Sequence, residues 1–113
     1  MDIRHEIRGA HLVCRPQGEM DEAAAGRLAA LLATAPLAAP KKVVLDLESV
    51  AYISSQGIAA LLKLQTDLSA HKRDLSLAAP TPLVRRILYQ AGLASALPIH
   101  LTVEAACGET QTP

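Results

Sequence analysis

Aromatic residues are almost absent from this chain of 113 residues, which has two Tyr, no Phe and no Trp. This scarcity argues against base-stacking platforms for nucleic acid and against aromatic cages for quaternary cations. It also leaves few of the side chains that usually anchor large permanent protein interfaces. Half of the residues are apolar, so the core must be built from Leu, Ala, Val and Ile.

The chain also lacks a net charge of either sign. Eleven basic residues balance eleven acidic ones, and the formal net charge is zero. Without a basic run, neither nucleic acid nor an anionic membrane is expected as the main partner. No apolar run approaches the roughly 18 residues that cross a bilayer, so we expect no membrane insertion. The first residues lack the apolar segment of a signal peptide, and we therefore expect a cytoplasmic protein.

Motifs for metals, nucleotides and nucleophilic catalysis are also missing. Cys14 and Cys107 lie far apart in the sequence and are expected to be free thiols in a reducing compartment. The four histidines show no metal-ligand spacing, and the six glycines form neither a dinucleotide-binding motif nor a P-loop. No serine stands in the Gly-x-Ser-x-Gly elbow of a hydrolase. We therefore expect no metal, no cofactor and no enzymatic activity.

The patterns that are present predict one compact α/β domain. Apolar or alternating runs predict strands at 3–8, 11–15, 43–47, 75–78 and 99–103. Helical periodicity predicts three helices, with starts at Asp21, at Ser54–Ser55 and at Thr81–Pro82, and Pro36 and Pro40 end the first of them. The nearly continuous apolarity of 43–47 favours an interior strand of a partly parallel sheet. The order is β-β-α-β-α-β-α-β, a mixed sheet with about three to four helices, over residues 2–103. Residues 104–113 are expected to be a loose tail.

Asp46 lies at the end of the expected central strand, where a phosphate-accepting receiver domain carries its acceptor. Such a site needs Mg²⁺, held by further carboxylates at the end of the first strand. Arg8, Gly9 and Ala10 occupy that end instead. We therefore expect Asp46 to bond local backbone at a strand end.

The segment Ser54-Ser55-Gln56-Gly57 combines two features at the start of the second helix. One serine suffices as the N-cap, which leaves the other free. Gly57 is locally unfavourable near the start of a helix, so its presence indicates a close approach either by the protein's own sheet or by a partner. Local signals do not decide between these two alternatives.

The stretch from Asp46 to Ile58 resembles the signature of STAS domains, and more narrowly of bacterial anti-sigma-factor antagonists. The family pattern runs Asp-Leu-Ser, four residues, then Ile-(Asp/Ser)-Ser-x-Gly-Leu. Gly18-Glu19-Met20-Asp21 resembles the family's entry to the first helix, and the segment from Leu75 to Leu93 resembles its strand and Pro-started helix. Glu48 and Ala59 depart from the family's usual residues. The resemblance covers about residues 2–103.

The resemblance implies a switch between binding partners. The unphosphorylated antagonist binds an anti-sigma factor that is also a GHKL-type serine kinase, and this binding frees a sigma factor. The kinase phosphorylates the serine at the position of Ser55, with Ser54 as the alternate acceptor, and a PPM-type phosphatase removes the phosphate. Partner-binding residues carried over from the resemblance or expected on the exposed helix side are Asp21, Ser54, Ser55, Gln56, Gly57, Ala59, Lys63 and Thr66.

The expected buried side of this helix carries Ile58, Leu61, Leu62, Gln65 and Leu68. On that basis Gly57→Arg is expected to abolish partner binding in a protein that still folds.

Two other readings of the sequence remain. The protein could be a STAS accessory subunit of a membrane transport complex, of the lipid-transport ATPase type, which would share the fold and need no phosphorylation. It could also be a weak nucleotide-binding protein, which the absence of a phosphate loop disfavours. For the antagonist itself we expect a monomer or weak dimer.

Overall fold

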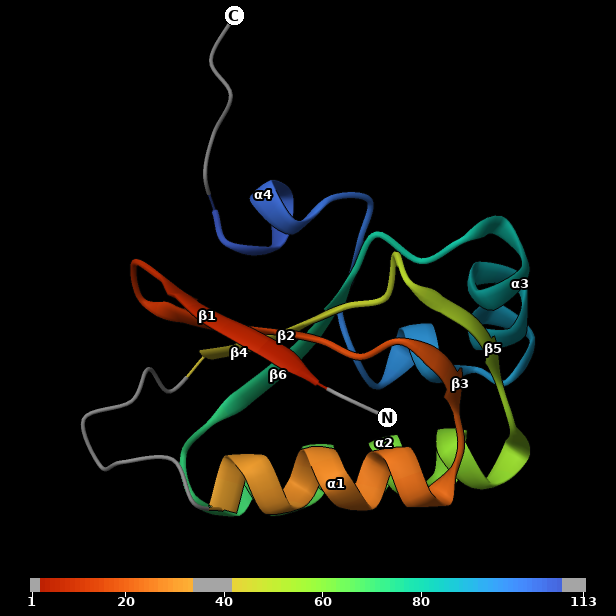
Figure 1. Ribbon diagram of the computed structural model, residues 1–113, viewed down its shortest axis with the longest axis horizontal. Helices are drawn as coiled ribbons and strands as arrows, with labels where there is room; N and C mark the ends of the chain where they lie inside the picture. The colour runs from red at the N-terminus through yellow and green to blue at the C-terminus, as the bar shows by residue number, and fades with distance from the viewer. Residues whose placement is uncertain (1–2, 34–41, 109–113) are drawn as a thin grey trace, which may run out of the picture.

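The computed structural model describes residues 3–33 and 42–108 (Figure 1). The strands are β1 (Arg4–Arg8), β2 (His11–Arg15), β3 (Gly18–Met20), β4 (Lys42–Asp46), β5 (Val50–Ile53), β6 (Asp74–Ala78) and β7 (Ile99–His100). The helices are α1 (Glu22–Ala33), α2 (Ser55–Ala70), α3 (Pro82–Gln90) and α4 (Val103–Ala106), with a 3₁₀ turn η1 (Leu93–Ser95) after α3.

The main sheet has five strands in the order β1-β2-β4-β6-β7. β1 pairs antiparallel with β2, and the other neighbours pair in parallel. The predicted class, an α/β domain with a mixed sheet, is therefore confirmed. β3 and β5 form a second, two-stranded parallel sheet. This pair is not predicted from the sequence, because strands of three and four residues carry too few positions to show a period.

Helices α1 and α2 pack against each other along one face of the main sheet (Figure 1). The period of two along β4 decides which residues meet them. Val43 and Leu45 belong to the core cluster under these helices, whereas Val44 lies in a smaller cluster on the opposite face. α4 and its C-cap residue cover part of that opposite face with Val103 and Cys107.

The helix starts follow the predicted caps. The Asp21 carboxylate accepts a hydrogen bond from the Ala24 N–H at 2.9 Å. The Thr81 hydroxyl accepts one from the Val84 N–H at 3.3 Å, with Pro82 as the first helical residue. These caps satisfy N–H groups that have no partner inside the helix. The predicted end of the first helix at Pro36 and Pro40 lies outside the described residues.

The end of the chain differs from the prediction. The strand expected at 99–103 stops at His100, and Val103–Ala106 form α4 instead. The Thr102 hydroxyl caps this helix by accepting from the Ala105 N–H at 3.0 Å. Val103 and Cys107, four residues apart, then point to the sheet and are buried. The expected tail from residue 104 thus begins inside a helix, and residues 109–113 lie outside the described part.

The buried side of α2 also differs. Leu62, which was expected in the core, is 36% exposed, whereas Leu64, which the prediction omitted, is buried. Gly57, Leu61, Leu64 and Leu68 form the buried side. The burial of Gly57 at the helix start turns the whole helix, so that the inward line runs through 57, 61, 64 and 68.

Two further expectations are confirmed. Cys14 and Cys107 are both thiols outside any disulfide and are buried, in clusters on opposite faces of the sheet. Burial raises the pKa of the Cys14 thiol to about 11. Asp46 bonds local backbone, since its Oδ1 accepts the Glu48 N–H at 3.0 Å. Over 3–33 and 42–108, no helix is long and apolar enough to span a membrane.

Candidate functional site

The candidate site is built where β5 ends and α2 begins. Ser54 is the N-cap of α2, with extended backbone at φ −79° and ψ 166°. Its hydroxyl oxygen accepts the Gly57 N–H at 3.0 Å. Its own N–H donates to the Met20 carbonyl at 3.1 Å. The side chain and the backbone of Ser54 are therefore both engaged in the fold. The hydroxyl caps the start of α2, and the N–H joins that start to the end of β3.

Ser55 is the first residue of α2, and it is exposed. Among the described residues its hydroxyl has no hydrogen-bond partner. The structure thus separates two serines that the sequence left equivalent as caps. Ser54 performs the capping, and Ser55 presents an unengaged hydroxyl to solvent.

Gly57 is buried against the end of β3 rather than presented to a partner. A Cβ built on it would overlap the Met20 carbonyl oxygen and lie 2.9 Å from the carbonyl carbon of Met20. Backbone atoms cannot move aside as a flexible side chain can, so any side chain here must displace β3 or α2. The close approach is therefore made by the protein's own sheet. The expectation that Gly57→Arg leaves the protein folded is wrong for this reason.

Asp21 lies beside the start of α2. Its Cα is 3.4 Å from the Cβ position at Gly57, so the first turn of α1 and the first turn of α2 lie next to each other. Gln56 is exposed at the same end. The structure therefore brings together Asp21, Ser54, Ser55 and Gln56, four of the predicted site residues.

The exposed side of α2 continues from this end. Ser55, Ala59, Leu62 and Thr66 follow one another at spacings of four, three and four residues, which places them on one line along the helix. Lys63 lies beside this line and is also exposed. We call these five residues the α2 stripe. Leu62 is the member that the sequence analysis missed, and the signal that could have found it is its helical spacing from Ser55.

The first turn of α2 favours negative charge. It contains no acidic residue, and the N–H groups of Ser55 and Gln56 have no acceptor among the described residues. The positive end of the helix dipole adds to these N–H groups. A phosphate on Ser55 would therefore sit in a favourable local field.

Metal chemistry finds no support in the part of the chain that the structure covers. Across residues 3–33 and 42–108, no group of three or more His, Cys, Asp or Glu side chains is placed to hold a metal ion.

Comparison with known proteins fixes the family. The sequence profile of the STAS domain matches residues 2–106. The chain belongs to the STAS domain family. The expected resemblance is thereby confirmed, and the match includes both the segment 54–57 and helix α4.

Relatives and solved structures agree with this assignment. BtrV of Bordetella bronchiseptica, described as an anti-sigma factor antagonist, is 33% identical over 107 residues, which are 95% of this chain and 91% of BtrV. The anti-sigma factor antagonist SpoIIAA, in its unphosphorylated form, aligns with a TM-score of 0.73 at 24% identity, over 94% of this chain and 93% of SpoIIAA. A sulfate transporter family protein from Wolinella succinogenes has a TM-score of 0.78 at 20% identity, over 91% of this chain and 86% of its own. These two likenesses show the STAS fold alone.

Proposed function

We propose that this STAS domain is an anti-sigma-factor antagonist whose binding is switched by phosphorylation of Ser55. It acts as a binding module and not as an enzyme. The observation that carries the proposal is the difference between the two serines at the start of α2. Ser54 caps the helix, whereas Ser55 is exposed and its hydroxyl has no hydrogen-bond partner among the described residues. The relative BtrV, similar over nearly the whole chain, supports the same function. SpoIIAA, which has been solved in a phosphorylated form, shares the fold.

The partner is an anti-sigma factor with serine kinase activity of the GHKL type, and a PPM-type phosphatase reverses the modification. In the forward step the Ser55 Oγ attacks the γ-phosphorus of ATP. The bond from that phosphorus to the β,γ-bridging oxygen breaks and ADP leaves. The hydroxyl proton passes to a base of the kinase. The phosphatase returns the hydroxyl and inorganic phosphate by hydrolysis.

The α2 stripe, together with Gln56 and Asp21, is the surface that we assign to the partner. Leu62 supplies its large apolar side chain, and Lys63 supplies a positive charge. A phosphate adds about 1.5 to 2 negative charges at neutral pH. Since the first turn of α2 tolerates that charge, the switch acts at the interface, where a dianion must be desolvated against a surface shaped for a neutral hydroxyl.

The test begins with the modification site. The protein is isolated from its native cells and digested with trypsin, and the peptide Val43–Lys63 is sequenced by mass spectrometry. This peptide contains Ser49, Ser54 and Ser55, so fragment ions separate the alternatives. We expect phosphate on Ser55. Phosphate confined to Ser54 or Ser49 contradicts the assignment, and a protein that is never phosphorylated supports an accessory-subunit role instead.

Variants of the two serines then separate switching from folding. Ser55→Ala should bind the kinase and escape phosphorylation. Ser55→Asp should lose at least tenfold in kinase affinity, which is about 1.4 kcal/mol, while its melting temperature changes by only a few degrees. Ser54→Ala should lose about 1 kcal/mol of stability with its cap and still accept phosphate on Ser55. Ser69→Ala, an exposed serine at the other end of α2, is the matched control and should change neither property. A phosphorylated protein that binds as tightly as the unmodified one refutes the mechanism.

A further inference from the structure

The outer edge of β1 is a surface of the main sheet that the proposed switch does not use. β1 lies at one end of the sheet, and the strand at the other end, β7, has only two residues. The pairing of β1 with β2 is regular, and β1 contains neither proline nor glycine. In Figure 1, β1 crosses the front of the molecule with no other described element drawn over it. An open edge of this kind is able to pair with a further strand.

The backbone groups that face this edge belong to His5 and Ile7. Arg8 and His11 flank the two-residue turn of the β1–β2 hairpin, where Gly9 has the positive φ of 59° that such a turn requires. The residues beside a turn of this type exchange backbone hydrogen bonds, and bonded and non-bonded pairs then alternate along the ladder. Every second residue back from Arg8 therefore bonds to β2, whereas the N–H and C=O groups of His5 and Ile7 point outward. No described residue bonds to these outward groups.

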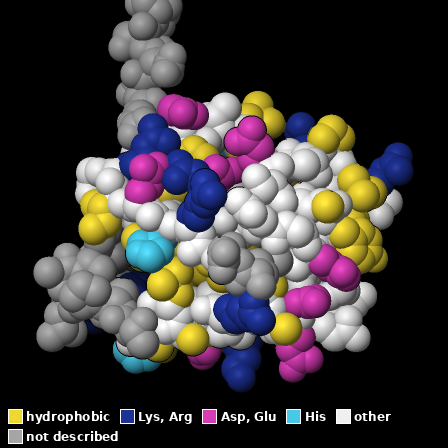
Figure 2. Space-filling model, in the orientation of Figure 1, with side chains coloured by type: hydrophobic (Ala, Val, Ile, Leu, Met, Phe, Trp, Pro, Cys, Tyr) yellow, Lys and Arg dark blue, Asp and Glu magenta, His cyan; other side chains and the backbone are white. Residues whose placement is uncertain are grey.

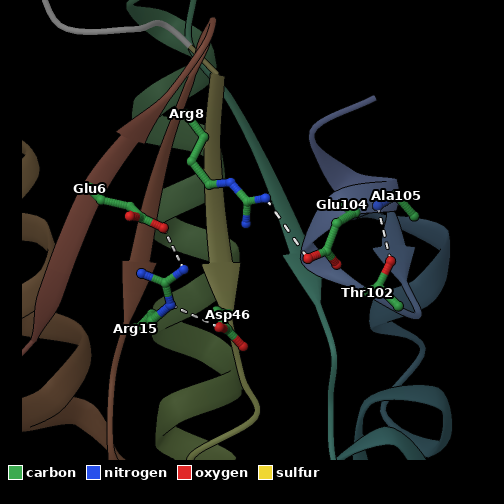
Figure 3. Close-up of polar contacts among 7 residues, drawn as sticks. All are labelled: Glu6, Arg8, Arg15, Asp46, Thr102, Glu104 and Ala105. Carbon is green, nitrogen blue, oxygen red and sulfur yellow. Dashed lines mark hydrogen bonds and ion pairs between the residues drawn. The ribbon is translucent and has the colours of Figure 1, made fainter. Parts of the chain in front are cut away.

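The side chains along this edge are also incompletely paired. Arg4 is exposed and has no hydrogen bond or ion pair with any described residue. It lies directly opposite Arg15 in β2, and like charges in opposite positions destabilise a sheet. Arg15 itself donates to Glu6 at 2.6 Å and to Asp46 at 3.1 Å (Figure 3). Since Ile7 is 65% exposed, the edge presents both a cation without a carboxylate and an aliphatic side chain without a cover.

The sequence of this edge is complementary to itself. From Ile3 to Ile7 it reads Ile-Arg-His-Glu-Ile, and in the reverse order it reads Ile-Glu-His-Arg-Ile. An antiparallel copy centred on His5 therefore places Arg4 opposite Glu6 twice. The same copy places Ile3 opposite Ile7 twice. Pairs of opposite charge and of apolar β-branched side chains stabilise an antiparallel sheet at such positions.

Other registers of two β1 strands bring like charges together or use groups that already have partners. The outward backbone groups belong to odd-numbered residues, so a two-fold axis must pass through a residue of each copy. An axis at an even-numbered residue places Arg4, Glu6 or Arg8 opposite its own copy, which opposes like charges. An axis at Ile7 would pair Glu6 with Arg8. The Arg8 guanidinium already faces Glu104 at 3.8 Å on its own chain (Figure 3), and this pairing would run into the hairpin turn. The first register alone avoids both conflicts.

We propose that β1 is a dimerisation edge, on which a second copy of this chain pairs antiparallel about His5 and extends the sheet across both copies. Arg15 uses only Oε1 of Glu6, and a carboxylate accepts from more than one donor, so Glu6 pairs with Arg4 of the second copy as well. The pairing is short and falls below the roughly 1,200–2,000 Å² of a stable interface. We therefore expect a weak dimer, with a Kd of about 0.1–1 mM.

The test begins with the purified full chain in a dilution series from about 2 mM to about 0.02 mM, which brackets that range of Kd. Sedimentation velocity measures the mass, and ¹H–¹⁵N NMR locates the contact. We expect a reversible equilibrium of monomer and dimer, with shifts centred on the amides of His5 and Ile7, whose N–H groups gain acceptors. A chain that stays monomeric throughout overturns the proposal, and so does a dimer whose shifts lie outside β1.

Charge reversals then test the register. Arg4→Glu opposes carboxylates across the interface and Glu6→Arg opposes guanidinium groups, so each variant alone should dimerise at least tenfold more weakly. An equimolar mixture of the two variants restores both pairs of opposite charge. The mixture should therefore form a heterodimer at least tenfold more tightly than either variant pairs with itself. Arg4 has no partner to lose within the chain, so Arg4→Glu carries the test if Glu6→Arg does not fold.

The matched control is Arg86→Glu, which makes the same change of charge on an exposed residue of α3. It should leave dimerisation unchanged. The proposal is overturned if Arg4→Glu dimerises like the unmodified chain, or if Arg86→Glu weakens the dimer equally. It is also overturned if two folded variants gain nothing on mixing. None of these outcomes bears on phosphorylation of Ser55, because β1 is not part of that surface.

Discussion

The two faces of the main sheet are built on different principles. The face under α1 and α2 carries the large apolar cluster, and alternate residues of β4, such as Val43 and Leu45, enter that cluster. The opposite face receives Val44 from the same strand, and Asp46 continues that side of β4. It is covered by a helix of only four residues. One strand therefore serves a packed core on one side and a partly charged surface on the other.

The two faces of the sheet therefore contribute differently to the stability of the fold. Ion pairs contribute little when they are solvent-exposed, whereas burial of apolar area is the main driving force of folding. The α4 face holds the Glu6–Arg15–Asp46 contacts and a cavity of about 460 Å³. Charged side chains are also prominent in the upper part of the space-filling view (Figure 2). The face under α1 and α2 can thus carry most of the fold's stability, and the α4 face holds most of the charged contacts of the sheet.

The largest expected effect is the loss of stability when a core side chain is truncated, and it should differ between the two faces of the sheet. Leu77→Ala, on the α1 and α2 face with no exposure, should lower the free energy of unfolding by about 2–5 kcal/mol. Val103→Ala on α4 should cost only about 1–2 kcal/mol, because fewer carbons are lost and α4 can adjust. Urea unfolding of both variants measures the difference. Equal losses would mean that the α4 face is as tightly packed as the other.

A smaller effect is expected at the buried acid of the α4 face. Asp46→Asn keeps the shape and an oxygen for the Glu48 N–H, but it removes the charge that faces Arg15. Since Arg15 retains Glu6, the loss should be about 1–2 kcal/mol. Glu48→Gln is the matched control on the same turn and should change stability by less than about 0.5 kcal/mol. A loss as large as that of Leu77→Ala would show that this ion pair is part of the structural core.

Local sequence signals predicted most of the fold. The caps at Asp21 and Thr81 and the apolar strand at 43–47 depend on neighbouring residues, and the structure confirms them. The elements that were not predicted depend on contacts between residues that are distant in the sequence. β3 and β5 exist because Met20 pairs with Ile53, which is far away in sequence. The alternation of Leu101 and Val103 resembled a strand, but the cap at Thr102 and the sheet under Val103 decided for a helix.

The candidate site was predictable in position but not in detail. The pair Ser54-Ser55 located the start of α2, yet only backbone geometry shows which serine caps it. Gly57 was open to two readings, and the Met20 carbonyl decides between them. The register of the buried side of α2 follows from that contact, so Leu62 could not be placed correctly from the apolar pattern alone. The cavity on the α4 face could not be predicted from the sequence, because its walls come from β1, β2, β4, α4 and three loops.

The smallest expected effect concerns Glu6, at the exposed end of the charged contacts. The hydrogen bond from Arg15 holds the pKa of the Glu6 carboxyl below its usual value of 4.5, against a smaller opposing effect of burial. A carboxyl with a lowered folded pKa stabilises the native state above its unfolded pKa, and this contribution is lost as the pH falls through the folded pKa.

Glu6→Gln should therefore be slightly less stable than the unmodified protein at neutral pH. The two unfolding curves should converge as the pH falls below the usual Glu range, and added salt should narrow the gap at neutral pH as well. Urea midpoints measured across this pH range provide the measurement. A gap that persists in acid would mean that Glu6 acts by packing on the sheet rather than by charge. The packed face and the charged face would then differ less, because even the most exposed member of the Glu6–Arg15–Asp46 contacts would stabilise the fold as a core residue does.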